Sequence, residues 1–373
     1  MLASSQEKSS AEALFRVAER YNPKRSFLFV STVLGKHFPS RVSSMDSVFQ
    51  DLCDKLPSDV RNYAVIAMAE TAIGLGAGVF QRCVDRFGSG IFGTSTRFPS
   101  SNIASNFSEP HSHATEQCLC LPSDTKDRRF LERADDLIFI DDELTTGRTI
   151  RNLACTVLAQ TGIRPKRIFV LSITDWSQGA LDLEIPDDIQ VSFLSLVKGR
   201  YSWEGNGNQF DLPAFTDCSS MPDTRMAFID SPRNWLSSPV QFCNWPASVN
   251  EFVEVTEPGE KVLVVGTGEF MAKPLAVAQH IEAKGGEVYF SSTTRSPAMT
   301  GNSSGYFEGY GVRSRIVFPD LYQGQGMNYL YNHDLHCWNR ILLYTDAKPS
   351  NISSDLIQKL KPDHVASDFE LIA

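Results

Sequence analysis

The stretch that decides the fold is Leu137-Ile-Phe-Ile-Asp-Asp-Glu-Leu-Thr-Thr-Gly-Arg-Thr149. Its first four residues are apolar and predict a buried β-strand that ends at Ile140. Asp141 and Asp142 follow at the carboxyl end of that strand, which is where open α/β sheets hold their ligands. The remaining residues turn into a predicted helix over 149–161. The stretch therefore predicts a strand, a turn that carries a ligand site, and a helix.

The turn combines groups that bind an anion with groups that bind hydroxyls. Gly147 lets the backbone approach an anion closely. The hydroxyls of Thr145, Thr146 and Thr149 can donate to the same anion, together with the amides at the start of the helix. The preceding carboxylates would instead accept hydrogen bonds from vicinal hydroxyls. A ribose 5-phosphate carries both features, whereas the alternative is an acidic turn that only caps a helix.

The same stretch resembles the 5-phosphoribosyl-1-pyrophosphate motif of type I phosphoribosyltransferases, which is a hydrophobic strand, two acidic residues and Thr-Thr-Gly-x-Thr. This resemblance implies a parallel sheet flanked by helices and a Mg²⁺-dependent transfer of the phosphoribosyl group with release of pyrophosphate. It also implies that Asp141 and Asp142 bind the ribose and the metal, and that Thr145–Thr149, including Arg148, bind the 5-phosphate. Glu143 departs from the commoner apolar residue at its place, and it either faces solvent or helps to hold the metal.

Two other segments are candidates for holding the pyrophosphate. Residues 67–78 (AMAETAIGLGAG) are similar to the pyrophosphate loop of the same family, with Glu70, Thr71 and Ala72 at the turn. The glycines of this segment could equally be helix-packing residues. Lys36 follows a predicted strand and could pair with a phosphate as a point charge, or lie on the surface. We expect no dedicated metal motif, because Mg²⁺ usually keeps waters and binds through substrate phosphates.

A long interruption at about 98–127 is rich in Ser, Asn, Pro and His and shows no clear period. Loops of this length inside a domain are usually functional or disordered. Its place matches the flexible catalytic loop of type I phosphoribosyltransferases, so we expect a lid that excludes water from the reacting centre. His111 or His113 could contact pyrophosphate or shuttle a proton. A zinc site and a plain disordered loop are the alternatives.

The chain alternates between predicted strands and helices in both halves, which indicates two α/β domains with parallel sheets. We predict an N-terminal helix over 11–20. The domains predicted are a phosphoribosyltransferase domain over 1–200, a linker or hood over 201–250, and a second, Rossmann-like α/β domain over 251–373. The predicted strands are 26–31, 63–69, 137–140, 167–174 and 191–197 in the first domain, and 261–265, 287–292, 315–318 and 340–344 in the second.

The second domain has its own anion-friendly turns at the ends of two predicted strands. Gly266 and Gly268 open a helix but lack the full dinucleotide-binding spacing. Thr294, Arg295 and Ser296 offer hydroxyls and a guanidinium that suit phosphate or carboxylate, although a capped turn with a surface arginine is the alternative. The Thr-Arg-Ser-Pro string resembles the TRSP domain, found beside phosphoribosyltransferases in bacterial tellurium-resistance and stress gene clusters. That context implies biosynthesis of a nucleotide-like metabolite.

The overall composition limits the classes of partner that we expect. The net charge of −9 gives no general attraction to nucleic acid or anionic lipid. The longest apolar runs are too short to span a bilayer, so we expect a cytoplasmic protein with no membrane contact. Its partners would be 5-phosphoribosyl-1-pyrophosphate and a ring-shaped acceptor, with a homodimer as a possible assembly. A non-catalytic regulatory protein that binds this donor or a nucleotide is the main alternative, and a hydrolase in the second domain is a weaker one.

Overall fold

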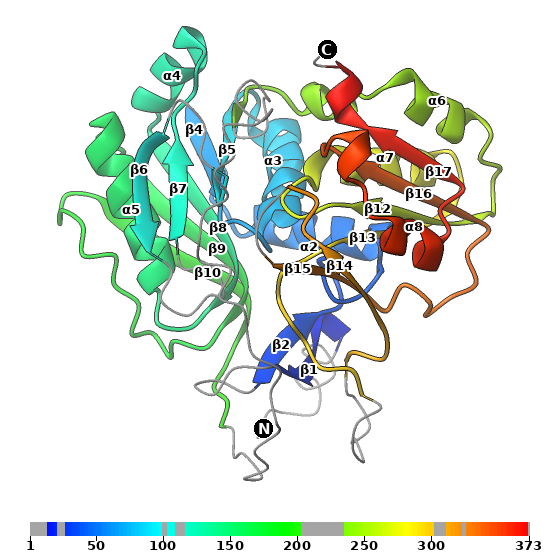
Figure 1. The fold of residues 1–373 in the computed structure, drawn as a ribbon. Helices are drawn as coiled ribbons and strands as arrows, with labels where there is room; N and C mark the ends of the chain where they lie inside the picture. Colours follow the sequence, from blue (N-terminus) through cyan, green and yellow to red (C-terminus); the bar gives the residue numbers. More distant parts are fainter. Residues whose placement is uncertain are drawn as a thin grey trace. The chain divides into compact units, whose positions relative to one another are not determined.

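The structure is a computed structural model that describes residues 13–20, 27–98, 103–108, 116–202, 235–301, 311–322 and 326–371. Its contacts divide the chain into two compact units (Figure 1). We call 46–200 with 219–244 the central unit, and 1–45 with 201–218 and 245–373 the terminal unit. Among the described residues, no helix is both long and apolar enough to cross a membrane.

The central unit is built on a mostly parallel sheet with the strand order β10-β9-β8-β4-β5-β7-β6. The first five strands in this order are parallel, while β7, β6 and the short β11 are antiparallel additions. Every residue of β4 is buried, as expected for a strand covered on both faces. The strands are β4 Tyr63–Ala67, β5 Ile91–Thr96, β6 Ile103–Ser108, β7 Glu116–Cys120, β8 Asp136–Leu144, β9 Arg167–Asp175, β10 Gln190–Lys198 and β11 Trp235–Leu236. The helices are α2 Val42–Asp54 (whose first residues fall in the terminal unit), α3 Ile73–Phe87, α4 Thr125–Glu132, α5 Arg148–Thr161 and the 3₁₀ turn η1 Pro239–Cys243.

Two sequence predictions for this unit need correction. Strand β8 does not end at Ile140 but continues to Leu144, because β9 runs on to Asp175 and pairs with the acidic residues. The segment 98–127 is not a structureless loop, since its described parts contain β6, β7 and the start of α4. These strands were not predicted because the segment is rich in polar residues. Strands β6 and β7 form an antiparallel ribbon at the side of the sheet, where the alternation of apolar and polar residues is weak.

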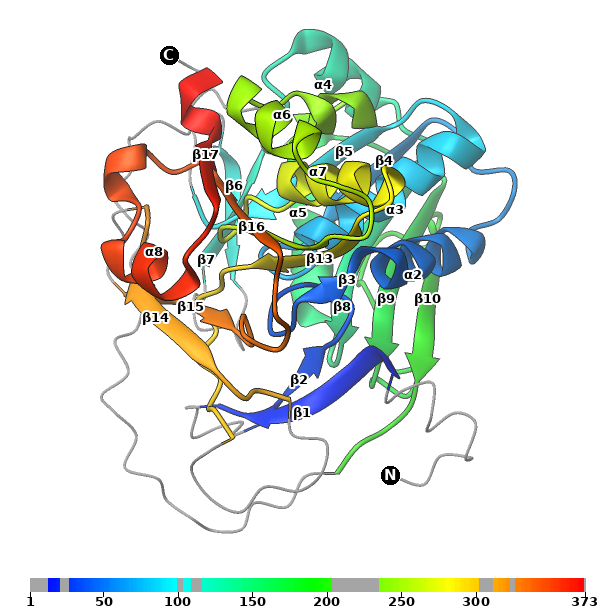
Figure 2. The same ribbon diagram turned by 90° about the vertical axis from the view of Figure 1, so that its right-hand side faces the viewer.

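The terminal unit has a second sheet with the strand order β17-β16-β12-β13-β3. Four neighbours, β17, β16, β12 and β13, are parallel, and β3 joins the edge in antiparallel pairing with β13. Helix α7 contacts both β12 and β13 (Figure 2). The strands are β3 Ser40–Arg41, β12 Lys261–Gly266, β13 Glu287–Ser292, β16 Arg340–Thr345 and β17 His364–Ser367. The helices are α6 Ala247–Glu254, α7 Ala272–Ala283 and α8 Ser354–Leu360, with 3₁₀ turns η2 Pro349–Asn351 and η3 Asp368–Leu371.

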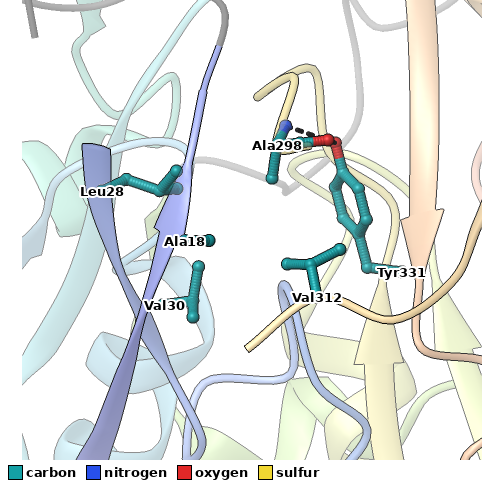
Figure 3. Packing of buried hydrophobic residues seen from close by; sticks show 6 residues of the cluster. All are labelled: Ala18, Leu28, Val30, Ala298, Val312 and Tyr331. Carbon is teal, nitrogen blue, oxygen red and sulfur yellow. Dashed lines mark hydrogen bonds between the residues drawn. The ribbon is translucent and has the colours of Figure 1, made fainter. Parts of the chain in front are cut away.

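Two antiparallel ribbons complete the terminal unit: β1 Phe15–Glu19 with β2 Phe27–Ser31, and β14 Arg315–Pro319 with β15 Met327–Tyr331. The predicted helix over 11–20 is therefore wrong in the part that forms β1. Pairing with β2 overrides the weak helical period, because it lets this segment bury its apolar residues. The described part of 13–45 thus groups with the terminal unit, whereas the sequence suggested one domain over 1–200. Figure 3 shows the hydrophobic cluster to which the β1–β2 ribbon contributes. It consists of Ala18, Leu28, Val30, Ala298, Val312 and Tyr331.

Candidate active site

The acidic pair lies in the last residues of β8, at the carboxyl edge of the central sheet. Successive side chains of a strand point to opposite faces, so Asp141 and Glu143 share one face and Asp142 points to the other. All three are half-buried. The amide of Asp142 donates to Asp141 Oδ1 at 2.9 Å, and Thr174 Oγ1 of the neighbouring strand donates to the Asp142 carbonyl at 3.5 Å. The pair is thus fixed by pairing with β9 rather than held on a free loop.

The Thr-Thr-Gly turn leads directly into α5. Gly147 caps the helix with φ +70°, a conformation that favours glycine, and it offers no side chain to the helix amides, while the Thr146 hydroxyl accepts from the Arg148 amide at 3.5 Å. A Cβ at this position would lie 2.6 Å from Leu181 Cδ2, so the end of that leucine would have to move. Thr146 and Arg148 are exposed, while Thr145 and Thr149 are half-buried. The helix start is thus uncapped by its N-cap residue and presents amides and hydroxyls at one helix end, an arrangement that suits phosphate.

The predicted pyrophosphate loop lies beside the acidic pair. Strand β4 is the parallel neighbour of β8, and the amide of Met68 donates to the Ile140 carbonyl at 2.9 Å. Ser95 Oγ accepts from the Ala69 amide at 2.8 Å, and Gln117 Nε2 donates to the Ala69 carbonyl at 2.9 Å. The peptide bond that follows, between Ala69 and Glu70, is cis. Contacts from β8, β5 and β7 therefore hold this loop at the same sheet edge as the acids.

The start of α3 repeats the arrangement seen at α5. Its N-cap is Ala72, which offers no side-chain cap, while Thr71 is half-buried and Glu70 is buried. Two uncapped helix starts thus follow two adjacent parallel strands. Within α3, a Cβ on Gly76 would lie 2.4 Å from Ala67 Cβ, and one on Gly78 would lie 2.1 Å from the Phe49 ring. These two glycines therefore serve helix packing, the alternative that the sequence left open.

Arg97, which no sequence pattern indicated, follows β5 at the same edge of the sheet. Its Nη1 lies 3.5 Å from Glu70 Oε2, and the two side chains are only 12% and 6% exposed. This guanidinium is the basic group that meets the predicted pyrophosphate loop, which itself contains no lysine or arginine. A lone arginine at the start of a Ser- and Pro-rich segment gives no pattern in the sequence. Only the adjacency of β4 and β5 reveals it.

The other predicted residues of the first domain fall elsewhere. Lys36 lies in the terminal unit, with its ammonium 2.7 Å from the Gly268 carbonyl, 3.1 Å from the Thr293 carbonyl and 3.4 Å from Ser292 Oγ. These contacts match the three donors of an ammonium. The predicted role of Lys36 toward pyrophosphate stays a prediction. His111 and His113 lie outside the described residues.

In the terminal unit, the turn with Gly266 and Gly268 uses its amides internally. The Gly268 amide donates to Thr293 Oγ1 at 2.9 Å, and the Phe270 amide donates to the Thr267 carbonyl at 2.8 Å. Its role as an anion site stays a prediction.

The Thr-Arg-Ser-Pro string is anchored by the ribbon β14–β15. Thr294 pairs with Tyr329 through both backbone groups, and Tyr331 Oη donates to the Ser296 carbonyl at 2.7 Å. Arg295 Nη2 lies 3.6 Å from Asp320 Oδ2. The string thus combines backbone anchoring with one buried guanidinium.

The fold and the site together define a class: an α/β protein whose parallel sheet carries carboxylates and uncapped helix starts at one carboxyl edge. The chain belongs to the phosphoribosyl transferase family, whose model matches residues 14–200. A second model, the TRSP domain that lies C-terminal to this phosphoribosyl transferase, matches residues 241–360. The α/β fold of the type I phosphoribosyltransferases is therefore joined to a second, mixed α/β domain. No curated protein matches the chain.

Several solved structures are similar to part of the chain. Adenine phosphoribosyl transferase from Trypanosoma brucei, in complex with AMP, pyrophosphate and ribose-5-phosphate, is 13% identical with a TM-score of 0.34, over 52% of this chain and 79% of that one. Hypoxanthine phosphoribosyltransferase from Staphylococcus aureus is 13% identical with a TM-score of 0.27, over 41% and 74%. A hypothetical protein from Neisseria gonorrhoeae with bound ppGpp is 12% identical with a TM-score of 0.29, over 45% and 86%.

Proposed function

We propose that the central unit transfers the phosphoribosyl group of 5-phosphoribosyl-1-pyrophosphate to a small ring-shaped acceptor and releases pyrophosphate. The observation that carries this proposal is the single sheet edge where Asp141 and Asp142 lie between two uncapped helix starts, those of α3 and α5. One uncapped start suits the 5-phosphate and the other suits the pyrophosphate. The product would be a nucleotide-like compound, in keeping with the metabolite biosynthesis expected of the family.

Each group has a role that follows from its place. The amides and hydroxyls of Thr145–Thr149 hold the 5-phosphate, and the carboxylates of Asp141 and Asp142 accept hydrogen bonds from the ribose hydroxyls. Glu70 and Thr71, with Arg97 beside them, meet the pyrophosphate as the bond from C1 to its oxygen breaks. Positioning and charge stabilisation then supply most of the rate increase.

The donor set at this edge also fits Mg²⁺. Asp141 and Asp142 supply half-buried carboxylate oxygens, the hard ligands that this ion prefers. The two aspartates would hold the ion together with substrate oxygens, and the ion would neutralise charge on the leaving pyrophosphate. Glu143 lies on the same face of β8 as Asp141 and could bind a water of the ion.

The test is the double substitution Asp141→Asn with Asp142→Asn. We expect calorimetry to show at least about a 100-fold loss of affinity for 5-phosphoribosyl-1-pyrophosphate, because two charge-assisted hydrogen-bond acceptors are lost. The matched control is Asp187→Asn with Asp188→Asn, an exposed adjacent pair of the same unit, which should bind as the native chain does. Equal affinity for all three proteins would refute the site, provided that their circular dichroism spectra agree.

Turnover is tested separately by following pyrophosphate release with a panel of bases and with cell extract. Release that needs both donor and acceptor supports a transferase. Tight donor binding with no release under any of these conditions would favour the alternative, a regulatory protein that senses the donor.

A further inference from the structure

Several charged side chains are buried, wholly or in large part, near the carboxyl edge of the terminal sheet, within the terminal unit alone. Lys36, Glu269 and Asp346 are 2%, 3% and 6% exposed. The side chains of Arg295 and Asp320 are 12% and 3% exposed. Charged groups are almost never buried this far unless they are paired, and strongly desolvated groups gather at functional sites. Their charges are of both signs, so the set differs from a simple acidic cluster.

Asp346 stands at the end of a chain of hydroxyls. Tyr322 Oη lies 2.6 Å from Asp346 Oδ1 and 2.8 Å from Thr267 Oγ1, which in turn lies 2.7 Å from Thr345 Oγ1. A hydroxyl carries one proton, and a carboxylate only accepts. Tyr322 therefore donates to Asp346, Thr267 to Tyr322, and Thr345 to Thr267. The relay ends at the Asp346 carboxylate and orients it, and Tyr322 Oη also lies 3.2 Å from the Thr267 carbonyl.

Arg295 is joined to this network through one short segment. Its partner Asp320 also accepts from Asn328 Nδ2 at 2.8 Å, and Tyr322 follows Asp320 by two residues. The segment 320–322 therefore links the guanidinium to the relay, because Asp320 contacts Arg295 and Tyr322 contacts Asp346.

Lys36 connects the loop after β12 with the loop after β13. Its ammonium donates to the Gly268 carbonyl after β12 and to the Thr293 carbonyl after β13. The glycine before it accepts from the Ser292 amide at 2.6 Å. Both loops are thus held rigidly by a segment from the start of the chain, which is the support a preorganised site needs.

The topology places this network where ligands bind. The chain builds β13 on one side of β12 and then crosses to build β16 and β17 on the other side. The carboxyl ends of β12 and β16 therefore form a topological switch point, the general binding position of open α/β sheets. Thr267 follows β12 directly, Thr345 ends β16, and Asp346 comes next.

We propose that the terminal unit has a ligand site of its own at this switch point, which binds a phosphorylated ribosyl compound. Arg295 takes the phosphate, since its planar fork suits that group. Asp346 accepts hydrogen bonds from the ribose hydroxyls.

The probe is ribose 5-phosphate, titrated by calorimetry into the full chain. We expect two sites in the native protein and one in the Asp141→Asn, Asp142→Asn protein. Arg295→Met or Asp346→Asn, added to that double variant, should remove the remaining binding. Tyr322→Phe keeps the packing, and in the double variant it should weaken the remaining binding of ribose 5-phosphate roughly 10-fold. This is the effect of one hydrogen bond to a charged group. Arg313→Met and Asp355→Asn, exposed residues of the same unit, are the matched controls.

The two proposals fail in different ways. If the double variant binds no ribose 5-phosphate, the terminal site is refuted while the central site stands. If the double variant binds as the native chain does and Arg295→Met abolishes all binding, the central site is refuted and the terminal site stands. Should Tyr322→Phe fold normally and bind with native affinity in the double variant, the relay has no part in binding and the proposed site is wrong.

Discussion

Arg97 Nη1 lies 3.5 Å from Glu70 Oε2, and this ion pair sets a guanidinium beside a loop that has no basic residue of its own. The two side chains come from the ends of adjacent parallel strands, β4 and β5. The Glu70 carboxylate contacts one nitrogen of a guanidinium fork that carries five donors in all. The pair therefore orients a cation toward the place where pyrophosphate is expected.

The first prediction concerns this cation. Arg97→Gln should raise the KM for 5-phosphoribosyl-1-pyrophosphate and the inhibition constant for pyrophosphate by roughly 10-fold to 100-fold, because one charge-assisted contact is lost. Steady-state kinetics with pyrophosphate as product inhibitor measures both. Arg128→Gln, an exposed arginine of α4, is the control and should leave both constants unchanged. Equal pyrophosphate inhibition of the Arg97 variant and the control would show that Arg97 does not touch this group.

The second prediction compares the two ends of α5. Gly147 and Gly162 cap the helix with φ +70° and +65°, and only Gly147 has a side chain, that of Leu181, within reach of an added Cβ. Substitution of either glycine by Ala should cost about 1–2 kcal/mol of unfolding free energy from backbone conformation alone. Gly147→Ala should in addition weaken donor binding, since it distorts the phosphate turn. Denaturant unfolding and calorimetry separate the two effects, and equal donor affinity in both variants would contradict the role of the turn.

The local fold around the candidate central site could be predicted because its information is local, and the roles of its residues stay predictions. The strand, the acidic pair and the Thr-Thr-Gly turn stand in one stretch, and β8 and α5 take these places. Arg97 and the relay to Asp346 could not be predicted, because their partners are distant in sequence. Tyr322 meets Thr267 across 55 positions and Asp346 across 24. Such contacts depend on strand order, which hydrophobic periodicity does not encode.

The prediction of a helix in the N-terminal segment was wrong for a related reason. Leu14, Val17 and Ala18 fit a helical period, and nothing local indicates that Phe15–Glu19 pairs with Phe27–Ser31. The β-structure arises because the ribbon buries Ala18 against residues near the other end of the chain, among them Tyr331. Tertiary burial of this kind overrides local propensity.

The third prediction concerns the stability of the central unit. Arg167 holds the buried Asp136 carboxylate with two hydrogen bonds, of 2.7 Å and 2.8 Å, and also contacts the exposed Asp59 at 2.9 Å. Arg167→Met leaves a carboxylate that is 1% exposed without its cation, so we expect a loss of about 3–5 kcal/mol in unfolding free energy. Asp59→Asn removes the exposed half of the same network and should cost much less, because water screens an exposed ion pair. Denaturant titration of both variants measures the difference in unfolding free energy. Equal losses in the two variants would show that the buried and exposed contacts of Arg167 do not differ in strength.

The last prediction concerns the pH dependence of the terminal unit. Burial lowers the pKa of His333 below the ordinary value of 6.5, against the opposing effect of Asp334, and burial also lowers the pKa of His336. Since the folded pKa is the lower one, the unfolded chain binds more protons between the two values. The unfolding free energy is therefore fully retained above the unfolded pKa and falls as the pH drops from there through the folded pKa.

A histidine can contribute a slope of at most about 1.4 kcal/mol per pH unit in this window, and the exposed His336 should contribute much less, because water screens it. We expect His333→Gln to reduce the pH dependence of the unfolding free energy in part. The double variant His333→Gln with His336→Gln should reduce it further. Denaturant unfolding between about pH 7 and about pH 5 measures these slopes, with a fluorescence signal from Trp338, whose Nε1 donates to the His333 carbonyl at 2.6 Å. Because the loss comes from proton uptake by the unfolded chain, an unchanged slope in the double variant would assign the acid sensitivity to other groups.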